Sequence, residues 1–172
     1  MLVAVTLLGL AVVLVTVLRG RDGAEEPLVD PCVVGNWTVQ NMTMAIETDA
    51  FGKIRFVSLG EIGKIEYGAD GTAVHAYGDE ARLSAEVTVS AVSQQAILTI
   101  TGVDRYDYRT SDSTMVFSSL RDDRTTTLTI DGIGVSSDID INMGLEPARF
   151  SCAGDSLTTF TENYRAEAHR DS

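Results

Sequence analysis

The chain has 172 residues and a mass of 18.5 kDa, with 13 Lys and Arg against 25 Asp and Glu and a formal net charge of −12. This length allows one domain with an anchor, or two very small domains. Such strong acidity makes nucleic acid a poor partner and disfavours binding to anionic lipid surfaces. The apolar content is that of a folded chain, which excludes disorder over most of the length.

The first 18 residues carry no charge and are apolar apart from two threonines. An 18-residue helix is about 27 Å long, close to the ~30 Å hydrocarbon core of a bilayer, so residues 1–18 predict a transmembrane anchor. A cleaved signal peptide is the alternative, but the segment has neither a basic start nor a small-x-small cleavage site. Residues 19–31 are polar and contain two Gly and two Pro, which indicates a linker.

The orientation of the anchor depends on two opposing signals. Arg19 and Arg21 directly follow the span, and the positive-inside rule would place the large domain in the cytoplasm. Large domains can nevertheless translocate despite flanking charge. The sequence has only two cysteines, Cys32 and Cys152, and in an exported domain we expect them to form a disulfide. We expect a single-pass protein of the cell membrane with its domain outside the cytoplasm; two free buried thiols would accompany the opposite orientation.

From Cys32 onward the chain shows short runs rich in Val, Ile, Thr and Tyr, separated by Gly, Asp and Ser, and no sustained helical period. Asp70-Gly71 predicts a tight hairpin turn, because Gly adopts positive φ without steric cost. Residues 93–95 and 121–124 are predicted hairpin loops. The predicted strands are 37–47, 53–59, 63–67, 72–77, 85–92, 96–101, 104–110, 114–120, 125–130, 137–143, 148–152 and 156–161.

Many short strands with hairpin-length connections are typical of an antiparallel sandwich or barrel. A barrel removes the exposed edges that an open sheet would have to protect. We therefore predict an all-β, antiparallel up-and-down barrel of about 8–10 strands over residues 32–165. A charged, flexible tail is predicted over residues 166–172.

Gly35-Asn36-Trp37, at the start of an extended strand, resembles the Gly-x-Trp opening of the lipocalins and the wider calycin group. The hairpin at 69–72 and the run at 150–157 resemble the lipocalin-like domains of actinobacterial envelope proteins. The resemblance implies a lipocalin-like barrel with Trp37 packed at its closed end. It also implies an arginine from the last strand lying across Trp37; Arg165 matches by position, with Arg149 as the alternative.

Two pairs of residues are candidates for contact with a ligand. Tyr106 and Tyr108 share one face of a predicted strand, as do Ile65 and Tyr67, and one face of every strand lines the interior of a barrel. We expect these four residues to contact a small hydrophobic or amphipathic ligand, with the phenols orienting its polar end. Ordinary core filling, or tyrosines that face solvent, is the alternative.

A metal site is suggested by one segment and then disfavoured by its details. Asp138, Asp140 and Asn142 supply oxygen ligands at every second residue, like the start of a calcium loop. An EF-hand loop needs Gly and Glu where this chain has Met143 and Arg149. A strand with alternating faces explains the spacing better, so we predict no metal and no cofactor.

Catalytic motifs are also missing from the sequence. Neither His75 nor His169 has a matching Ser or Cys arrangement, and no nucleophile elbow, phosphate-binding Gly loop or His-Glu-x-x-His motif occurs. We therefore expect no enzymatic activity. The leading hypothesis is a membrane-anchored, extracytoplasmic barrel that binds a lipid-like molecule; the alternative is a side-chain-filled barrel that serves as a protein-interaction or structural module.

Overall fold

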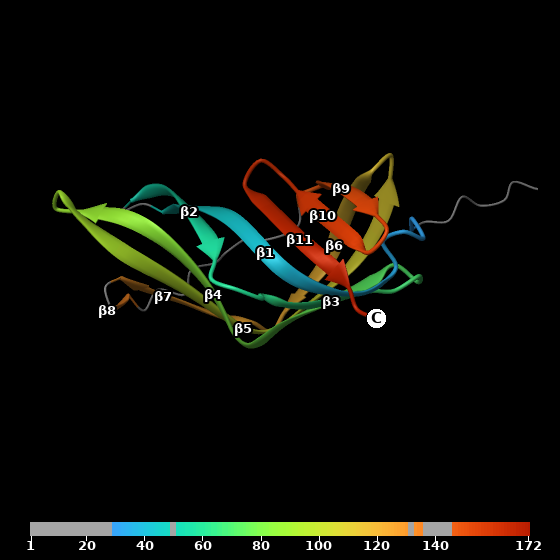
Figure 1. Ribbon diagram of the computed structural model, residues 1–172, viewed down its shortest axis with the longest axis horizontal. Helices are drawn as coiled ribbons and strands as arrows, with labels where there is room; N and C mark the ends of the chain where they lie inside the picture. The colour runs from blue at the N-terminus through green and yellow to red at the C-terminus, as the bar shows by residue number, and fades with distance from the viewer. Residues whose placement is uncertain (1–28, 49–50, 131–132, 136–145) are drawn as a thin grey trace, which may run out of the picture.

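The computed structural model describes residues 29–48, 51–130, 133–135 and 146–172 (Figure 1). These ranges contain strands and turns but no helix, and so none that could span a membrane. The predicted anchor over 1–18, the linker up to residue 28 and the predicted strand at 137–143 lie outside the described residues, as do Asp138, Asp140 and Asn142.

The strands of the described residues confirm the predicted all-β class. In chain order they are β1 (Gly35–Thr48), β2 (Gly52–Ser58), β3 (Gly63–Tyr67), β4 (Thr72–Val89), β5 (Val92–Ser111), β6 (Thr114–Asp122), β7 (Thr125–Ile130), β8 (Ile133–Val135), β9 (Ala148–Ala153), β10 (Ser156–Phe160) and β11 (Tyr164–Arg170).

Eight of these strands form a closed ring in the order β1-β3-β4-β5-β6-β9-β10-β11, with β11 pairing back to β1. Every pairing is antiparallel. The contact between β6 and β9 is short, with Thr114 opposite Arg149 and Met115 opposite Ala148. By contrast, β11 follows β1 from Trp37 to Met44. Closure therefore joins the two ends of the domain sequence.

β1, β4 and β5 are long and continue beyond the ring. Their extensions carry β2, which pairs with β1 and β4, and β7, which pairs with β5 (Figure 1). The predicted strands at 72–77 and 85–92 are one strand, because a bulge between Tyr77 and Ala81 shifts the register without ending the pairing. The predictions at 96–101 and 104–110 likewise merge into β5. The predicted loop at 93–95 is wrong; the turn is at Ser90–Ala91.

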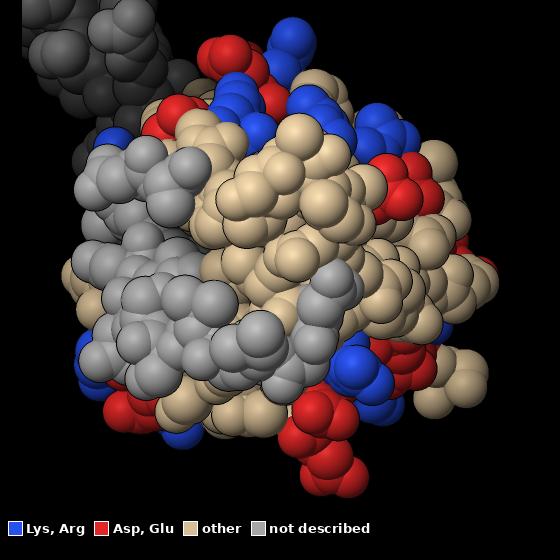
Figure 2. Space-filling view, turned by 90° about the vertical axis from the view of Figure 1, so that its left-hand side faces the viewer, with Lys and Arg blue, Asp and Glu red and all other residues tan. Residues whose placement is uncertain are grey.

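The end of the molecule that carries the β4–β5 hairpin shows uncharged residues at its centre and charged ones toward its edge (Figure 2). Acidic and basic side chains are interspersed along that edge, so the visible face carries no large patch of a single sign. Three large apolar side chains are exposed in the described part of the chain, at Val57, Leu59 and Val92.

The C-terminal segment belongs to the sheet. The predicted flexible tail over 166–172 is wrong, because β11 extends to Arg170 and pairs with β1 on one side and β10 on the other. Ala166 is buried and lies opposite Met42 and Thr159 in these two pairings. The segment is charged and short of large apolar residues, so its own composition does not indicate a strand between two neighbours.

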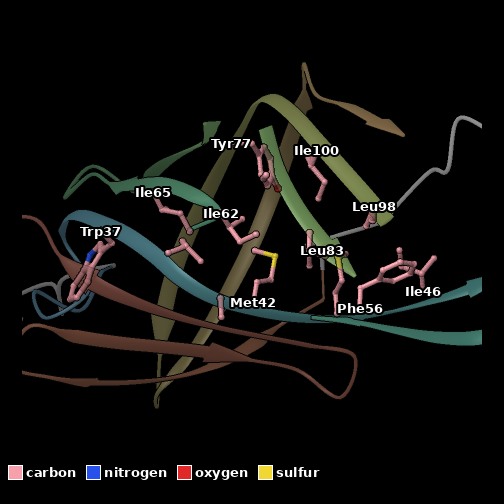
Figure 3. Packing of buried hydrophobic residues seen from close by; sticks show 14 of the residues in the cluster. Trp37, Met42, Ile46, Phe56, Ile62, Ile65, Tyr77, Leu83, Leu98 and Ile100 are labelled. Carbon is pink, nitrogen blue, oxygen red and sulfur yellow. The ribbon is translucent and has the colours of Figure 1, made fainter. Parts of the chain in front are cut away.

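One hydrophobic core runs through the ring and into the extensions of the long strands (Figure 3). Trp37 and Met42 are buried near the ring, while Phe56, Leu83 and Leu98 are buried farther along. Trp37 is fully buried, and its indole Nε1 donates to the carbonyl of Val33 at 2.7 Å. The predicted structural position of Trp37 in the core is therefore observed.

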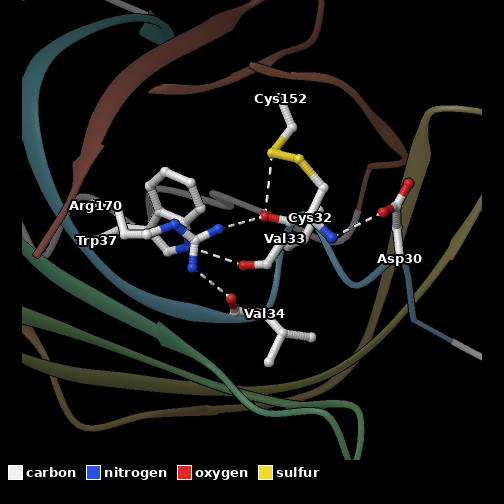
Figure 4. Close-up of a disulfide and its surroundings, with 7 residues drawn as sticks. All are labelled: Asp30, Cys32, Val33, Val34, Trp37, Cys152 and Arg170. Carbon is white, nitrogen blue, oxygen red and sulfur yellow. Dashed lines mark hydrogen bonds between the residues drawn. A yellow bond between two sulfur atoms is a disulfide. The ribbon is translucent and has the colours of Figure 1, made fainter. Parts of the chain in front are cut away.

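A disulfide joins Cys32 to Cys152, with 6.2 Å between the two Cα atoms (Figure 4). Cys32 lies in the turn before β1 and Cys152 lies in β9, which are separated by 120 residues in sequence. This pairing was predicted. It ties the first part of the domain to the strand that completes the ring next to β6.

The arginine that covers Trp37 is Arg170, not the predicted Arg165 or Arg149. The guanidinium of Arg170 lies 4.2 Å from the Trp37 ring centroid and donates to the carbonyls of Val34 and Cys32 at 2.8 Å each (Figure 4). Arg165 is exposed and pairs with Glu167 at 2.8 Å. It lies an odd number of residues from Arg170 on the same strand, so it projects from the opposite face.

Candidate ligand-binding cavity

A cavity of about 320 Å³ lies within the ring of strands, and each of the eight ring strands contributes at least one lining residue. The wall is largely apolar on β1, β3 and β6, where Met42, Met44, Ile65 and Phe117 face it. Ala73 on β4 is a small side chain that is buried at this wall. The cavity remains open partly because small side chains such as Ala73 alternate with larger ones in its wall.

The structure brings three of the four predicted ligand-contacting residues to this cavity. Ile65 and Tyr67 line it because β3 alternates strictly between buried and exposed positions, and Tyr106 lines it from β5. Tyr108 is not among the lining residues. Its ring packs edge-on against Tyr67 at 5.1 Å, and its hydroxyl donates to the carbonyl of Gly68 at 2.9 Å.

His75 is a polar lining residue that the sequence-based prediction did not include. It is 4% exposed, its ring is 4.0 Å from that of Tyr77, and its Nε2 has no hydrogen-bond partner among the described residues. Burial, helped by the charge of Arg124, lowers the pKa of His75 to about 3. The imidazole is therefore neutral at physiological pH and has one ring nitrogen free to bond a molecule in the cavity.

A buried ion pair fixes the aromatic wall beside His75. Asp104 is fully buried, and its Oδ2 accepts hydrogen bonds from Tyr77 and Tyr106 at 2.9 Å and from Arg124 at 2.8 Å. Arg124 also pairs with Asp122 at 3.0 Å. Burial raises the pKa values of Tyr77 and Tyr106, so both phenols stay protonated and donate to Asp104. Their rings are thereby held in the cavity wall.

Further polar lining residues are Tyr67 on β3, Thr159 on β10, Tyr164 on β11, Thr161 and Asn163 in the turn between β10 and β11, and two glutamates. Asn163 lies in that turn, and its Oδ1 is buried without a hydrogen-bond partner among the described residues. Glu47, near the end of β1, and Glu146, just before β9, are exposed lining residues. Among the described lining residues these two carboxylates are the only formal charges at neutral pH, since His75 is neutral.

Sequence reasoning could have found His75 but not Asn163. Ala73, His75 and Tyr77 share one face of β4, and the same period-2 argument that selected Ile65 and Tyr67 would have placed His75 inside. Asn163 reaches the cavity only because its carbonyl accepts from the Ala45 amide at 2.7 Å, a contact across more than a hundred residues.

Comparison of the chain with protein-family models and with curated proteins gives no match in either case. The interpretation of the cavity therefore depends on its own geometry. That geometry is able to enclose a small, mostly apolar molecule and to offer it hydrogen bonds at His75 and Asn163.

Proposed function

We propose that this chain is a lipocalin-like β-barrel that binds a small amphipathic molecule in the cavity within its ring of strands. The observation that carries the proposal is the buried Nε2 of His75, a residue that lines the largely apolar cavity; this atom has no hydrogen-bond partner among the described residues. Buried polar atoms in folded proteins are nearly always hydrogen-bonded, and an unpaired one costs about 1–3 kcal/mol. A bound molecule with a polar group would supply the missing bond.

The size and wall of the cavity support a small ligand. Its volume of about 320 Å³ lies at the lower end of the ~300–1,000 Å³ range of small-molecule sites. Apolar surface that a ligand buries there stabilises the complex by roughly 25 cal/mol per Å². The presence of a cavity favours ligand binding over the alternative of a side-chain-filled module. Binding is also favoured over catalysis, because binding requires only the enclosing wall and the polar groups already described.

The proposed location is the outer side of the cell membrane, with residues 1–18 as the anchor. The disulfide between Cys32 and Cys152 supports this location, since such bonds persist in oxidising compartments and are rare in the cytosol. An anchored barrel would keep its cavity close to the membrane, where lipid-like molecules are abundant.

Filling the cavity tests the proposal. In Ala73→Leu, a larger apolar side chain enters the cavity from β4, and we expect at least a tenfold loss of affinity for the uncharged fluorescent probe N-phenyl-1-naphthylamine, with a melting temperature at or above that of the wild type. Ala76→Leu, on the exposed face of the same strand, is the matched control and should bind like the wild type. Equal probe binding by all three full-length proteins, or no saturable binding by the wild type, would contradict the proposal.

A further inference from the structure

We infer that the cavity selects an amphiphile whose polar group is uncharged, such as a primary alcohol, over the carboxylate with the same chain. The inference depends on the proposed function and specifies its ligand class. It follows from the placement of a single unpaired imidazole nitrogen of His75 inside a cavity whose only charged lining residues in the described chain are Glu47 and Glu146.

The described lining offers the unpaired imidazole nitrogen of His75 and the hydroxyl groups of Tyr67, Thr159 and Tyr164, but no Lys or Arg. Arg124 is a positive charge that acts on His75, and it is already paired with Asp104 at 2.8 Å and Asp122 at 3.0 Å. The phenolic protons of Tyr77 and Tyr106 are directed to Asp104. An alcohol can donate to a neutral imidazole or accept from it, whereas a carboxylate would be buried without a counter-charge, which is strongly unfavourable.

Protonation of His75 does not supply the missing cation. The ring is 4% exposed and stacked on Tyr77, and burial together with Arg124 keeps its pKa near 3, so the imidazolium is absent at neutral pH.

The exposed part of the lining also disfavours a carboxylate headgroup. Glu47 and Glu146 are exposed acidic residues, and the buried, unpaired Oδ1 of Asn163 is an acceptor that a carboxylate cannot satisfy. Lys and Arg are missing from the described lining residues. An anionic headgroup therefore meets repulsion at this side and no compensating charge at the other.

Displacement of N-phenyl-1-naphthylamine from the full-length protein by 1-decanol and by decanoate at pH 7.5 tests the inference. The residual signal of Ala73→Leu is subtracted, so that only binding in the cavity counts. We expect 1-decanol to displace the probe at a concentration at least tenfold lower than decanoate. Equal potency of the alcohol and the acid, or tighter binding of the acid, would overturn the inference while leaving the proposed function intact. Failure of the probe to bind the wild type would instead contradict the proposed function.

Two sets of variants test which residues produce the preference for the alcohol over the carboxylate. His75→Leu should weaken 1-decanol binding about tenfold, while His169→Leu, at the other histidine, which is exposed, should not. Glu47→Gln combined with Glu146→Gln should strengthen decanoate binding several-fold and leave 1-decanol unchanged; Glu66→Gln, an exposed glutamate outside the lining, is the control. Unchanged alcohol binding in His75→Leu, measured with a retained melting transition, would contradict the role of the imidazole. Unchanged decanoate binding in the glutamate variant would contradict the repulsion.

Discussion

At the scale of single residues, His75 and Arg170 show how neighbours decide what a side chain does. His75 is neutral because it is enclosed beside a paired arginine, not because of anything in its own strand segment. Arg170 stacks on Trp37 because the register of β11 against β1 places the two residues opposite each other. Arg165, closer to the position that the family resemblance implies, points to the other face and binds Glu167.

The buried His75 makes stability depend on pH. Its pKa is about 3 in the folded chain and ~6.5 when unfolded, so between these values the unfolded state binds a proton that the folded state does not. Stability therefore falls as the pH is lowered through this window. We expect the wild type to lose about 3 kcal/mol more than His75→Gln between pH 7 and pH 4, as measured by urea denaturation.

Other groups near His75 titrate in both proteins and cancel in this comparison. Burial raises the pKa of Asp104 despite Arg124, which gives an opposite trend that the wild type and His75→Gln share. Parallel pH profiles for the wild type and His75→Gln would show that the imidazole is not held neutral by the fold.

At the scale of elements, the turns of the β4–β5 and β5–β6 hairpins have a backbone geometry that their sequence does not indicate. Both turns consist of two residues with positive φ, Ser90 and Ala91 in one and Asp112 and Ser113 in the other. This is the type I′ geometry that matches the twist of paired strands and normally selects Asn-Gly. Without a glycine these turns carry no clear sequence signal, which is why residues 93–95 were predicted as the loop.

Glycine in the second turn position should stabilise each hairpin. Ala91→Gly and Ser113→Gly remove a Cβ from the left-handed conformation, and we expect each to raise the free energy of unfolding by up to about 1 kcal/mol. Ala76→Gly, in the extended backbone of β4, should instead lower it by roughly 0.5–1 kcal/mol. Urea midpoints at constant m-value measure all three. A loss of stability in both turn variants would contradict the assigned turn geometry.

At the scale of the whole molecule, the ring depends on contacts between distant parts of the chain. β11 closes against β1, and the disulfide ties the turn before β1 to β9, next to the short β6–β9 seam. Closing a loop of 120 residues contributes about 5 kcal/mol in the loop-entropy description. The cavity lies inside this closed ring, so the covalent link and the proposed binding site belong to the same part of the fold.

Removal of the disulfide should weaken the whole domain. We expect Cys32→Ser combined with Cys152→Ser to unfold with a free energy about 5 kcal/mol lower than that of the oxidised wild type. Added reductant should bring the wild type to the same value and leave the double variant unchanged. A difference below about 1 kcal/mol would mean that the ring is held by its strands alone.

Local sequence patterns are sufficient to predict the all-β class, many of the strand limits, the turn at Asp70–Gly71 and the inward face of β3. These follow from the period-2 alternation and the turn chemistry of neighbouring residues, which are local properties. Thr72 confirms that turn, since its amide donates to the Asp70 carboxylate at 3.0 Å. The limits of β3 and β7 agree with the prediction for the same reason.

Contacts between residues far apart in sequence produce the closure of the ring, the strand at the C-terminus, the partner of Trp37 and the chemistry of the cavity. β11 has little apolar character of its own and is a strand because β1 and β10 pair with it on both sides. His75 is neutral because residues far away in sequence exclude water from it. Asn163 lies at the cavity because its backbone carbonyl is bonded to the distant Ala45 amide. The register between strands and the desolvation of a side chain are properties of the assembled fold, so they cannot be predicted from a local pattern of residues.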